Sequence, residues 1–381
     1  SLTATGSGAS AGIGSVWNSG NYSDSGAGDI EITGGDITAI GASSAAGIGS
    51  GCNATGETNI TISGTAKIKA QTEQGGAGIG SGSGATGNTN ITISGGTIET
   101  AQGGKGNASG GMGIRSGGML TISDNATIGT AKGGDGTADD GTGGTGIYSA
   151  GRLFISGGEI QNATGGNGGS GGSGGSGIRG DSAVNILGGI IKNAEGTGGG
   201  AGIGSGSDAN GNTTILIEGA AKVTATGGST AAGIGSGHYV GDINDPSVGS
   251  TTITIRNSDD GRVIPIIEAK GGSNENGSCW ASGAGIGSGG NTLNKTTINI
   301  EGGEITATGG VSLDSRNHSD ERLSGAGIGS GSNVSGETEI NIKGGTITKV
   351  TGGKYGGAGI GSGSSDTKDD SKKGAVTINI T

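Results

Sequence analysis

The sequence of 381 residues is poor in several residue types that most folds need. It contains two prolines and two cysteines, and aromatic residues make up only 2% of it. Collagen requires abundant proline and a strict G-X-Y period, so a collagen triple helix is excluded. One Phe, four Tyr and two Trp cannot fill the core of a conventional globular domain of this length.

Basic residues and long apolar runs are also scarce. Lys and Arg total 21 against 32 Asp and Glu, for a net charge of −11, and this balance argues against a nucleic-acid partner. No apolar run approaches the roughly 18 residues that cross a bilayer, so we expect no direct membrane insertion. No signal peptide or lipidation motif is visible, and both ends fall inside repeats. We therefore expect a fragment of a longer protein.

Glycine is abundant, with 99 residues, but the isoleucines alternate too regularly for simple disorder. The segment A-G-I-G-S, in places slightly altered, recurs along the whole chain. The interval between its central isoleucines ranges from 25 residues, between Ile178 and Ile203, to 52, between Ile234 and Ile286. Periods of this size are typical of a solenoid. The central isoleucines are Ile13, Ile48, Ile79, Ile114, Ile147, Ile178, Ile203, Ile234, Ile286, Ile328 and Ile360.

Two further short segments lie between successive copies. One reads T-x-I-x-I, as in Thr58–Ile62, and the other follows a G-G turn and reads x-I-x-A, as in Asp36–Ala39. Their period of two predicts strands, and glycine at this density excludes helices. We predict an all-β, single-stranded right-handed parallel β-helix of about 10–11 coils, each with three short strands. It would be one continuous domain over 1–381, with enlarged loops at 238–250, 273–283 and 311–324.

The segment G-A-G-I-G-S-G carries almost no side chain, so its backbone is expected to approach the other strands closely. The run from Ile298 to Gly310, leading to Gly325–Gly331, resembles the pectate-lyase-like β-helix repeats of Gram-positive cell-surface proteins of the gut Firmicutes type. This resemblance covers essentially the whole chain and implies an extracellular or cell-surface location. It is specific for fold and weak for chemistry, because the scaffold carries adhesins, carbohydrate-binding modules, lyases and hydrolases. No catalytic motif is matched, so no catalytic residue is transferred.

Three consecutive copies break the repeat at the position after the central isoleucine. Glycine stands there in the other eight copies, whereas these three have Arg115, Tyr148 and Arg179. If the isoleucines are in register, the three side chains point outward and stack. Such a column would form a cation–π ladder that offers an aromatic face to a sugar or an acidic group. The alternative is a surface stack that only rigidifies three weak coils.

The two longest intervals, from Ile234 to Ile328, contain much of the unusual chemistry. His238, Tyr239, Asp242 and Asp245 follow one A-G-I-G-S segment; Cys279 and Trp280 precede the next; Asp314, Arg316, His318, Asp320, Glu321 and Arg322 precede the one after. Loops on both sides of the third strand would build a groove with a glycine floor. Aromatic groove walls hold sugars, so Trp280, Tyr239 and His238 are predicted as the main contacts. The alternative is a set of solvated loops.

Catalysis in the same region remains an open alternative. Paired carboxylates suit glycoside hydrolysis, with Asp242, Asp245, Asp320 and Glu321 as candidates, and His318 is a candidate base for a lyase. Sequence does not place any two of these groups at a working distance. We expect no cofactor. Calcium at Asp135/Asp139/Asp140 or Asp366/Asp369/Asp370 is a weaker hypothesis, because ligand spacing of the 1-3-5 kind is missing.

Cys52 and Cys279 lie seven coils apart in the proposed register. At about 4.8 Å per coil they are separated by on the order of 30 Å, too far for a disulfide, so both are expected to be free thiols. The sequence as a whole favours an extracellular, adhesin-like β-helix that binds glycans or polysaccharide along the face of its third strands. The alternatives are an oligosaccharide- or polysaccharide-active enzyme using carboxylates within 238–322, and a structural stalk.

Overall fold

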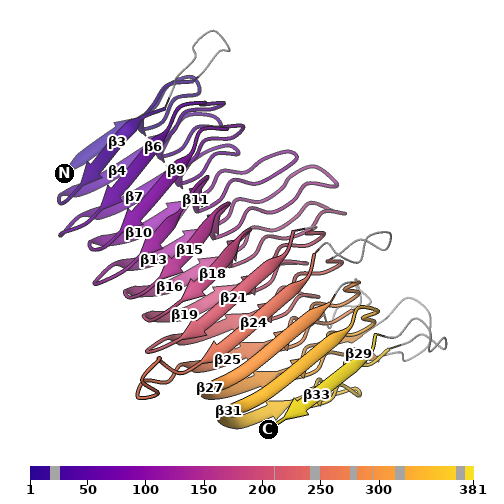
Figure 1. The fold of residues 1–381 in the computed structure, drawn as a ribbon. Coiled ribbons are helices and arrows are strands. Elements are labelled where there is room, and N and C mark those ends of the chain that lie inside the picture. The colour runs from indigo at the N-terminus through magenta and orange to yellow at the C-terminus, as the bar shows by residue number, and fades with distance from the viewer. Residues whose placement is uncertain are drawn as a thin grey trace. The chain divides into compact units, whose positions relative to one another are not determined.

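The computed structural model describes residues 1–17, 26–209, 211–240, 249–274, 281–293, 295–313, 322–365 and 374–381. These residues form two compact units, unit 1 (Ser1–Gly180) and unit 2 (Asp181–Thr381). Strands and turns make up both units (Figure 1). None of the described residues belongs to a helix with the length and apolarity to cross a membrane. The prediction of one continuous domain stays a prediction.

Unit 1 contains three rows of short parallel strands, and each complete coil contributes one strand to each row. The first row is β3 (Gly28–Ile32), β6 (Thr58–Ile62), β9 (Thr89–Ile93), β12 (Leu120–Ile122) and β15 (Arg152–Ile155). The second row is β1 (Leu2–Thr5), β4 (Asp36–Gly41), β7 (Lys67–Thr72), β10 (Thr97–Gln102), β13 (Thr127–Lys132) and β16 (Glu159–Thr164). The third row is β2 (Ile13–Gly14), β5 (Ile48–Gly49), β8 (Ile79–Gly80), β11 (Ile114–Ser116), β14 (Ile147–Ser149) and β17 (Ile178–Gly180).

Unit 2 repeats this plan, with two long strands that each bend from the first row into the second. The first row is β18 (Ala183–Ile186), β21 (Thr213–Glu218), β24 (Thr251–Arg256) and β33 (Val376–Ile380); the second is β19 (Ile190–Glu195), β22 (Lys222–Thr226) and β25 (Ile266–Lys270). The bent strands are β27 (Thr296–Thr308) and β31 (Thr338–Thr351). The third row is β20 (Ile203–Gly204), β23 (Ile234–Gly235), β26 (Ile286–Gly287), β30 (Ile328–Gly329) and β32 (Ile360–Gly361). An antiparallel pair, β28 (Val311–Leu313) and β29 (Arg322–Ser324), stands apart from the rows.

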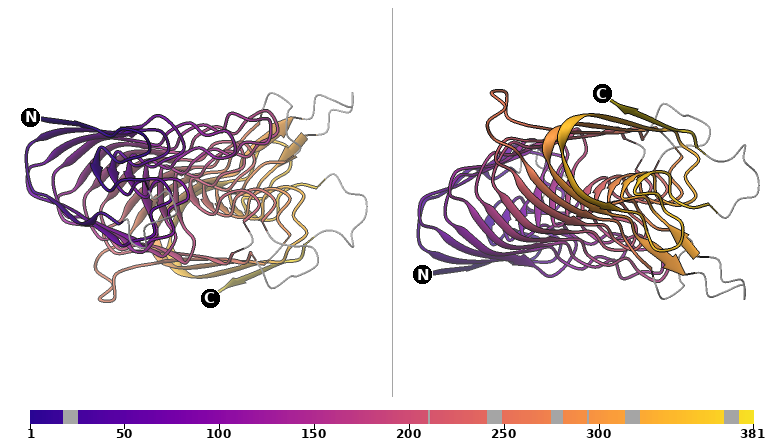
Figure 2. Two further views of the ribbon diagram at one scale, coloured as in Figure 1. Left: turned by 90° about the horizontal axis from the view of Figure 1, so that it is seen from above. Right: turned by 90° about the horizontal axis from the view of Figure 1, so that it is seen from below.

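Isoleucine stacks on isoleucine through the core of each unit. In the first row Ile30 pairs with Ile60 and Ile60 with Ile91, and in the third row Ile234 pairs with Ile286. Ile60, Ile91, Ile234 and Ile286 are almost completely buried. The coils follow one another in chain order within each unit, as the colours in Figure 2 show. Each unit is therefore a right-handed parallel β-helix, and the predicted fold class and strand period are confirmed.

Glycine is required in the third row because the next coil lies too close for a side chain. Gly235, which follows the central isoleucine of β23, has φ +139°. A Cβ atom added there would lie 1.8 Å from the carbonyl oxygen of Gly287 in the next coil. At Gly285, before the isoleucine of β26, an added Cβ would lie 2.8 Å from the backbone nitrogen of Thr308 in the second row. The expected close approach of thin third strands to the other rows is confirmed.

The serine of the A-G-I-G-S segment links several coils to the next. Its buried hydroxyl accepts a hydrogen bond from a glycine N–H of the following coil, and the donor glycine stands directly after the serine of that coil. In unit 1 Gly51 N donates to Ser15 Oγ at 2.9 Å, and in unit 2 Gly289 N donates to Ser236 Oγ at 3.0 Å. Backbone N–H groups next to a row of glycines thus obtain partners without a bulky side chain.

Replacing Ser236 with alanine is expected to lower the free energy of unfolding by about 1–3 kcal/mol, because the buried N–H of Gly289 loses its acceptor. Denaturant titration of the whole chain measures this loss. Ser335→Ala, which removes a hydroxyl from an exposed side chain of the same unit, is the matched control and should change little. Equal effects from the two variants would show that the serine hydroxyl contributes nothing to the stack.

Candidate functional site

The chain turns a sharp corner five residues after the central isoleucine of many coils. The corner residue has a positive φ of about 54° in Asn53, Asp208, Asn291 and Asn333. Asn, Asp and Gly adopt this left-handed conformation at little cost, and other side chains do so rarely. Tyr239 occupies the same corner with φ 52° and is the exception. An aromatic residue therefore stands where the fold favours Asn, Asp or Gly.

The corners of unit 2 stack into a column. Asp208 N donates to His238 O at 2.9 Å, and in the next coil Tyr239 N donates to Gly290 O at 3.3 Å. Asn291 N continues the ladder to Ser332 O at 3.0 Å. The side chains of Asp208, Tyr239, Asn291 and Asn333 consequently follow one another at about 4.8 Å per coil. We call these four residues the corner column.

Tyr239 lies at the surface of the corner column, and its ring packs against the ring of His238. Its side chain is 49% exposed. The two ring centres are 4.3 Å apart, and the ring planes meet at 66°, an edge-to-face contact. Asn291 Nδ2 lies 3.0 Å from His238 Nε2. Since an amide nitrogen donates, Nε2 accepts and the neutral imidazole carries its proton on Nδ1. The support fixes the orientation of the tyrosine ring.

Burial keeps His238 uncharged near neutral pH. Desolvation lowers the pKa of its imidazole from 6.5 to about 4, and the negative charge of Asp208 opposes this only in part. The ring is therefore neutral at pH 7. Its role in the site is to support Tyr239 and to accept from Asn291.

This pKa predicts a loss of stability in acid. The unfolded histidine titrates near pH 6.5 and the folded one near pH 4, so the unfolded state binds the proton more readily. The neutral imidazole of His238 therefore contributes about 3 kcal/mol to the free energy of unfolding. This contribution is complete above pH 6.5 and decreases as the pH falls from 6.5 to 4. Denaturant titrations at pH 7 and 4.5 measure it. His238→Gln, which does not titrate, should lose less stability across this range than the wild type; identical losses would contradict the prediction.

The predicted groove with a glycine floor is wrong at β20, β23, β26 and β30 of unit 2. β20, β23, β26 and β30 are completely buried. Each corner bonds across the third row to the segment that precedes the third strand of the coil before it. His238 N donates to Gly199 O at 2.9 Å, and Gly290 N donates to Thr230 O at 2.8 Å. The backbone on both sides of the third row thus closes over it, and the accessible surface is the corner itself.

Several predicted residues of the 238–322 region lie outside the described residues. They are Asp242, Asp245, Cys279, Trp280, Asp314, Arg316, His318, Asp320 and Glu321, so their binding and catalytic roles stay predictions. Asp260, in the same region, belongs to a turn: its carboxylate accepts from Ser258 Oγ at 2.6 Å and from Arg262 N at 3.1 Å. These hydrogen bonds lower the pKa of Asp260. Its contacts give it a structural role.

In unit 1 the three residues that replace glycine do stack, as the register predicted. Arg115 pairs with Tyr148 across β11 and β14, and Tyr148 pairs with Arg179 across β14 and β17. The Arg179 guanidinium carbon lies 5.7 Å from the centre of the Tyr148 ring, which is a cation–π contact. Tyr148 and Arg179 are half-buried. Their role in binding a sugar stays a prediction.

Arg115 is held by the protein itself rather than extended into solvent. Its Nη1 donates to Gly82 O of the preceding coil at 3.2 Å, and its Nε is buried without a partner among the described residues. Burial lowers the pKa of the guanidinium, and the interaction with Tyr148 opposes this. Arg115 thus fills the space above the corner of the preceding coil, which favours the rigidifying alternative for this residue.

The residues of the calcium and cysteine predictions lie partly within the described ranges. Asp135 Oδ1 accepts from Asn167 N at 3.0 Å, which joins two loops of unit 1. Within the described ranges no group of three or more His, Cys, Asp or Glu residues is arranged to hold a metal ion. The cluster Asp366/Asp369/Asp370 lies outside those ranges. Cys52 is a free thiol, as expected, and burial raises its pKa.

Sequence reasoning missed Asp208, Asn291 and Asn333 as neighbours of Tyr239. The signal was present in the pattern I-G-S-G-x-N or I-G-S-G-x-D, which places an αL-tolerant residue at the same distance from each central isoleucine. Aligning the repeats beyond the serine would have shown Tyr239 as the exception in a column of Asn and Asp.

Comparison with known protein families supports a parallel β-helix family. A family model described as a β-helix repeat matches residues 30–52, 60–83, 215–238, 298–332 and 340–364. The matched segments include third strands of both units, and 215–238 ends at His238 of the corner. Neither the comparison with curated proteins nor the comparison with solved structures found a match.

Proposed function

We propose that the protein is an extracellular, adhesin-like β-helix that binds glycans, and that unit 2 holds a sugar at the corner column. The observation that carries this proposal is Tyr239, a 49% exposed aromatic residue held in the left-handed conformation. A strained backbone of this kind persists where the surroundings fix it, and such strain concentrates at functional sites.

The chemistry of the corner column suits a pyranose ring. The tyrosine ring offers an apolar face of the kind that stacks on the apolar face of a sugar. Asp208 and Asn291, one coil to either side, supply a carboxylate and an amide for hydroxyl groups at the ring edge. His238 holds the tyrosine ring through its edge-to-face contact, so little conformational entropy is lost on binding.

The wider proposal rests on charge and on the repeat. A net charge of −11 favours a neutral partner such as a glycan or polysaccharide and disfavours nucleic acid. Secretion or attachment to a cell surface is the setting in which such a binder meets its ligand. In this proposal Tyr148 and Arg179 of unit 1 form a second platform on the same chain.

A glycan array probed with the full chain tests the proposal, followed by calorimetric titration of each glycan that binds. We expect binding without release of reducing ends, and a loss of at least tenfold in affinity for Tyr239→Ala. Hydrolysis or lyase products in the same samples would contradict the proposal of a glycan-binding protein and support the alternative of an enzyme. Binding that is indifferent to Tyr239→Ala would remove the corner column as the site.

A further inference from the structure

A change of loop length in unit 1 creates a pocket. Before β8, residues 73–78 join the second row to the third by a short path, and the corner at Ser83 closes over the third row, with Ser83 N donating to Ser44 O at 2.8 Å. Before β11 the connection, residues 103–113, is longer. The longer loops begin at this coil and continue along unit 1 (Figure 1). The first long loop therefore projects beyond the last short one.

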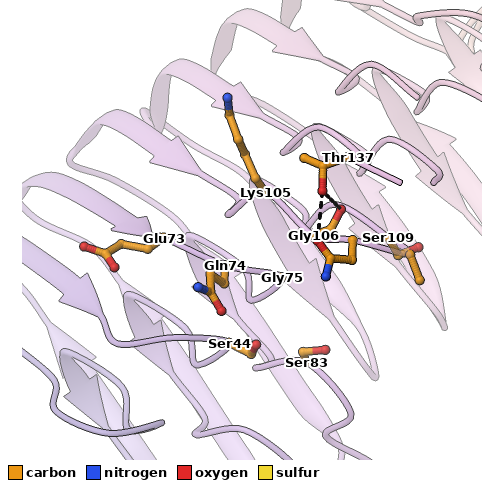
Figure 3. A pocket seen from close by; sticks show the side chains of 11 residues that line it. Ser44, Glu73, Gln74, Gly75, Ser83, Lys105, Gly106, Ser109 and Thr137 are labelled. Carbon is orange, nitrogen blue, oxygen red and sulfur yellow. Dashed lines mark hydrogen bonds between the residues drawn. The ribbon is translucent and has the colours of Figure 1, made fainter. Parts of the chain in front are cut away.

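The step between the two loops encloses about 520 Å³, within the range of small-molecule sites. Figure 3 shows Glu73, Gln74 and Gly75 on the short loop and Lys105, Gly106 and Ser109 on the long one. Ser44 and Ser83 line the pocket near the closed corner, and Asn107, Ala108 and Thr137 also belong to its lining. We call this the step pocket. It lies wholly within unit 1, so it is distinct from the corner column of unit 2.

The walls of the step pocket are fixed before any ligand arrives. On one side Lys105 N donates to Glu73 O at 3.2 Å, and Gly75 N donates to Lys105 O at 2.9 Å. On the other side Gly106 N donates to Asp135 O at 3.0 Å. Thr137 Oγ1 donates to Asn107 Oδ1 at 3.0 Å and so orients the Asn107 amide. A site held in this way loses little entropy when a ligand binds.

The functional groups of the step pocket are amides, hydroxyls and one pair of opposite charges. No ion pair between Glu73 and Lys105 is found within the described part of the chain, and their side chains extend in different directions in Figure 3. With charges that balance and no aromatic ring in its lining, the pocket suits a ligand that is neutral and rich in hydroxyl groups. Each sugar hydroxyl both donates and accepts, which matches the amide and hydroxyl side chains that line the pocket.

We propose that the step pocket binds a neutral saccharide unit through Gln74 and Asn107, independently of the corner column. Glu73 accepts from and Lys105 donates to hydroxyl groups at the pocket mouth. The chain would then carry two glycan sites of different design, one aromatic and one made only of hydrogen-bonding groups.

The test uses the full chain carrying Tyr239→Ala, so that the corner column does not contribute. Cellotetraose, maltotetraose, chitotetraose and the acidic tetragalacturonate are titrated by calorimetry. We expect at least one neutral probe to bind at one site per chain, and Gln74→Ala/Asn107→Ala to weaken it by roughly tenfold or more. Ala108→Trp, which places a large ring at a lining position, should abolish binding.

Gln161→Ala/Asn125→Ala removes two exposed amides of unit 1 outside the pocket and is the matched control. Its affinity should equal that of the Tyr239→Ala parent, and the thermal transitions of all variants should coincide. The proposal is overturned if no neutral probe binds, or if Gln74→Ala/Asn107→Ala behaves as the control. Selective binding of tetragalacturonate that Lys105→Met abolishes would also overturn it, because the site would then be an anion site. Wild-type binding at Tyr239 is measured separately, so the two proposals fail independently.

Discussion

Gly235→Ala is expected to destabilise unit 2 by about 2–6 kcal/mol. Two independent causes of destabilisation add, an unfavourable backbone conformation and a steric clash. The backbone has φ +139°, which an L-side chain rarely adopts, and the new Cβ would lie 1.8 Å from Gly287 O. The obstacle is backbone of the next coil rather than the end of a flexible side chain, so the pairing of β23 with β26 must open. Denaturant titration and thermal melting measure the loss.

Gly211→Ala is the control for this variant. A Cβ atom at Gly211 meets nothing within 4 Å, and its φ is not positive. Alanine there should be neutral or slightly stabilising, since it reduces the entropy of the unfolded chain. A wild-type melting curve for Gly235→Ala would contradict the close stacking of the third row.

Tyr239→Asn is expected to raise stability and to abolish function at the same time. Asparagine matches the corner conformation that Asn291 and Asn333 already adopt, so relief of strain should raise the free energy of unfolding by about 1 kcal/mol. Loss of the exposed aromatic face should weaken glycan binding by roughly thirtyfold. A residue kept for binding at the expense of the fold has this signature.

Tyr355→Asn provides the matched comparison. Tyr355 is a half-exposed tyrosine of the same unit outside the corner column, and the Arg322 guanidinium carbon lies 4.6 Å from its ring centre. Its φ is not positive, so asparagine should bring no gain in stability and no change in glycan affinity. If Tyr239→Asn lowers stability, or leaves binding intact, Tyr239 is a packing residue and the proposed site is wrong.

The repeat made the fold predictable, because the alternation of isoleucine and the recurrence of A-G-I-G-S depend only on local strand geometry. The same reasoning placed Arg115, Tyr148 and Arg179 in one column. The covered third row was not predictable, since His238 N meets Gly199 O across 39 residues of chain. The step pocket was missed because it arises from a difference between two neighbouring loops and not from any motif. Gln74 and Asn107 are unremarkable in sequence and are brought together by that difference alone.

The serine links and the isoleucine stacks have a mechanical consequence. Within a unit each coil is bonded only to the coils before and after it, as the pairing of β23 with β20 and β26 illustrates. Tension applied to the chain would therefore act on the terminal coil first, and the coils would unfold one after another. Each released coil, such as the 31 residues from Ile203 to Ile234, would lengthen the chain by roughly 100 Å. A β-helix of this kind would extend stepwise under shear while its remaining coils, and any binding site on them, stay folded.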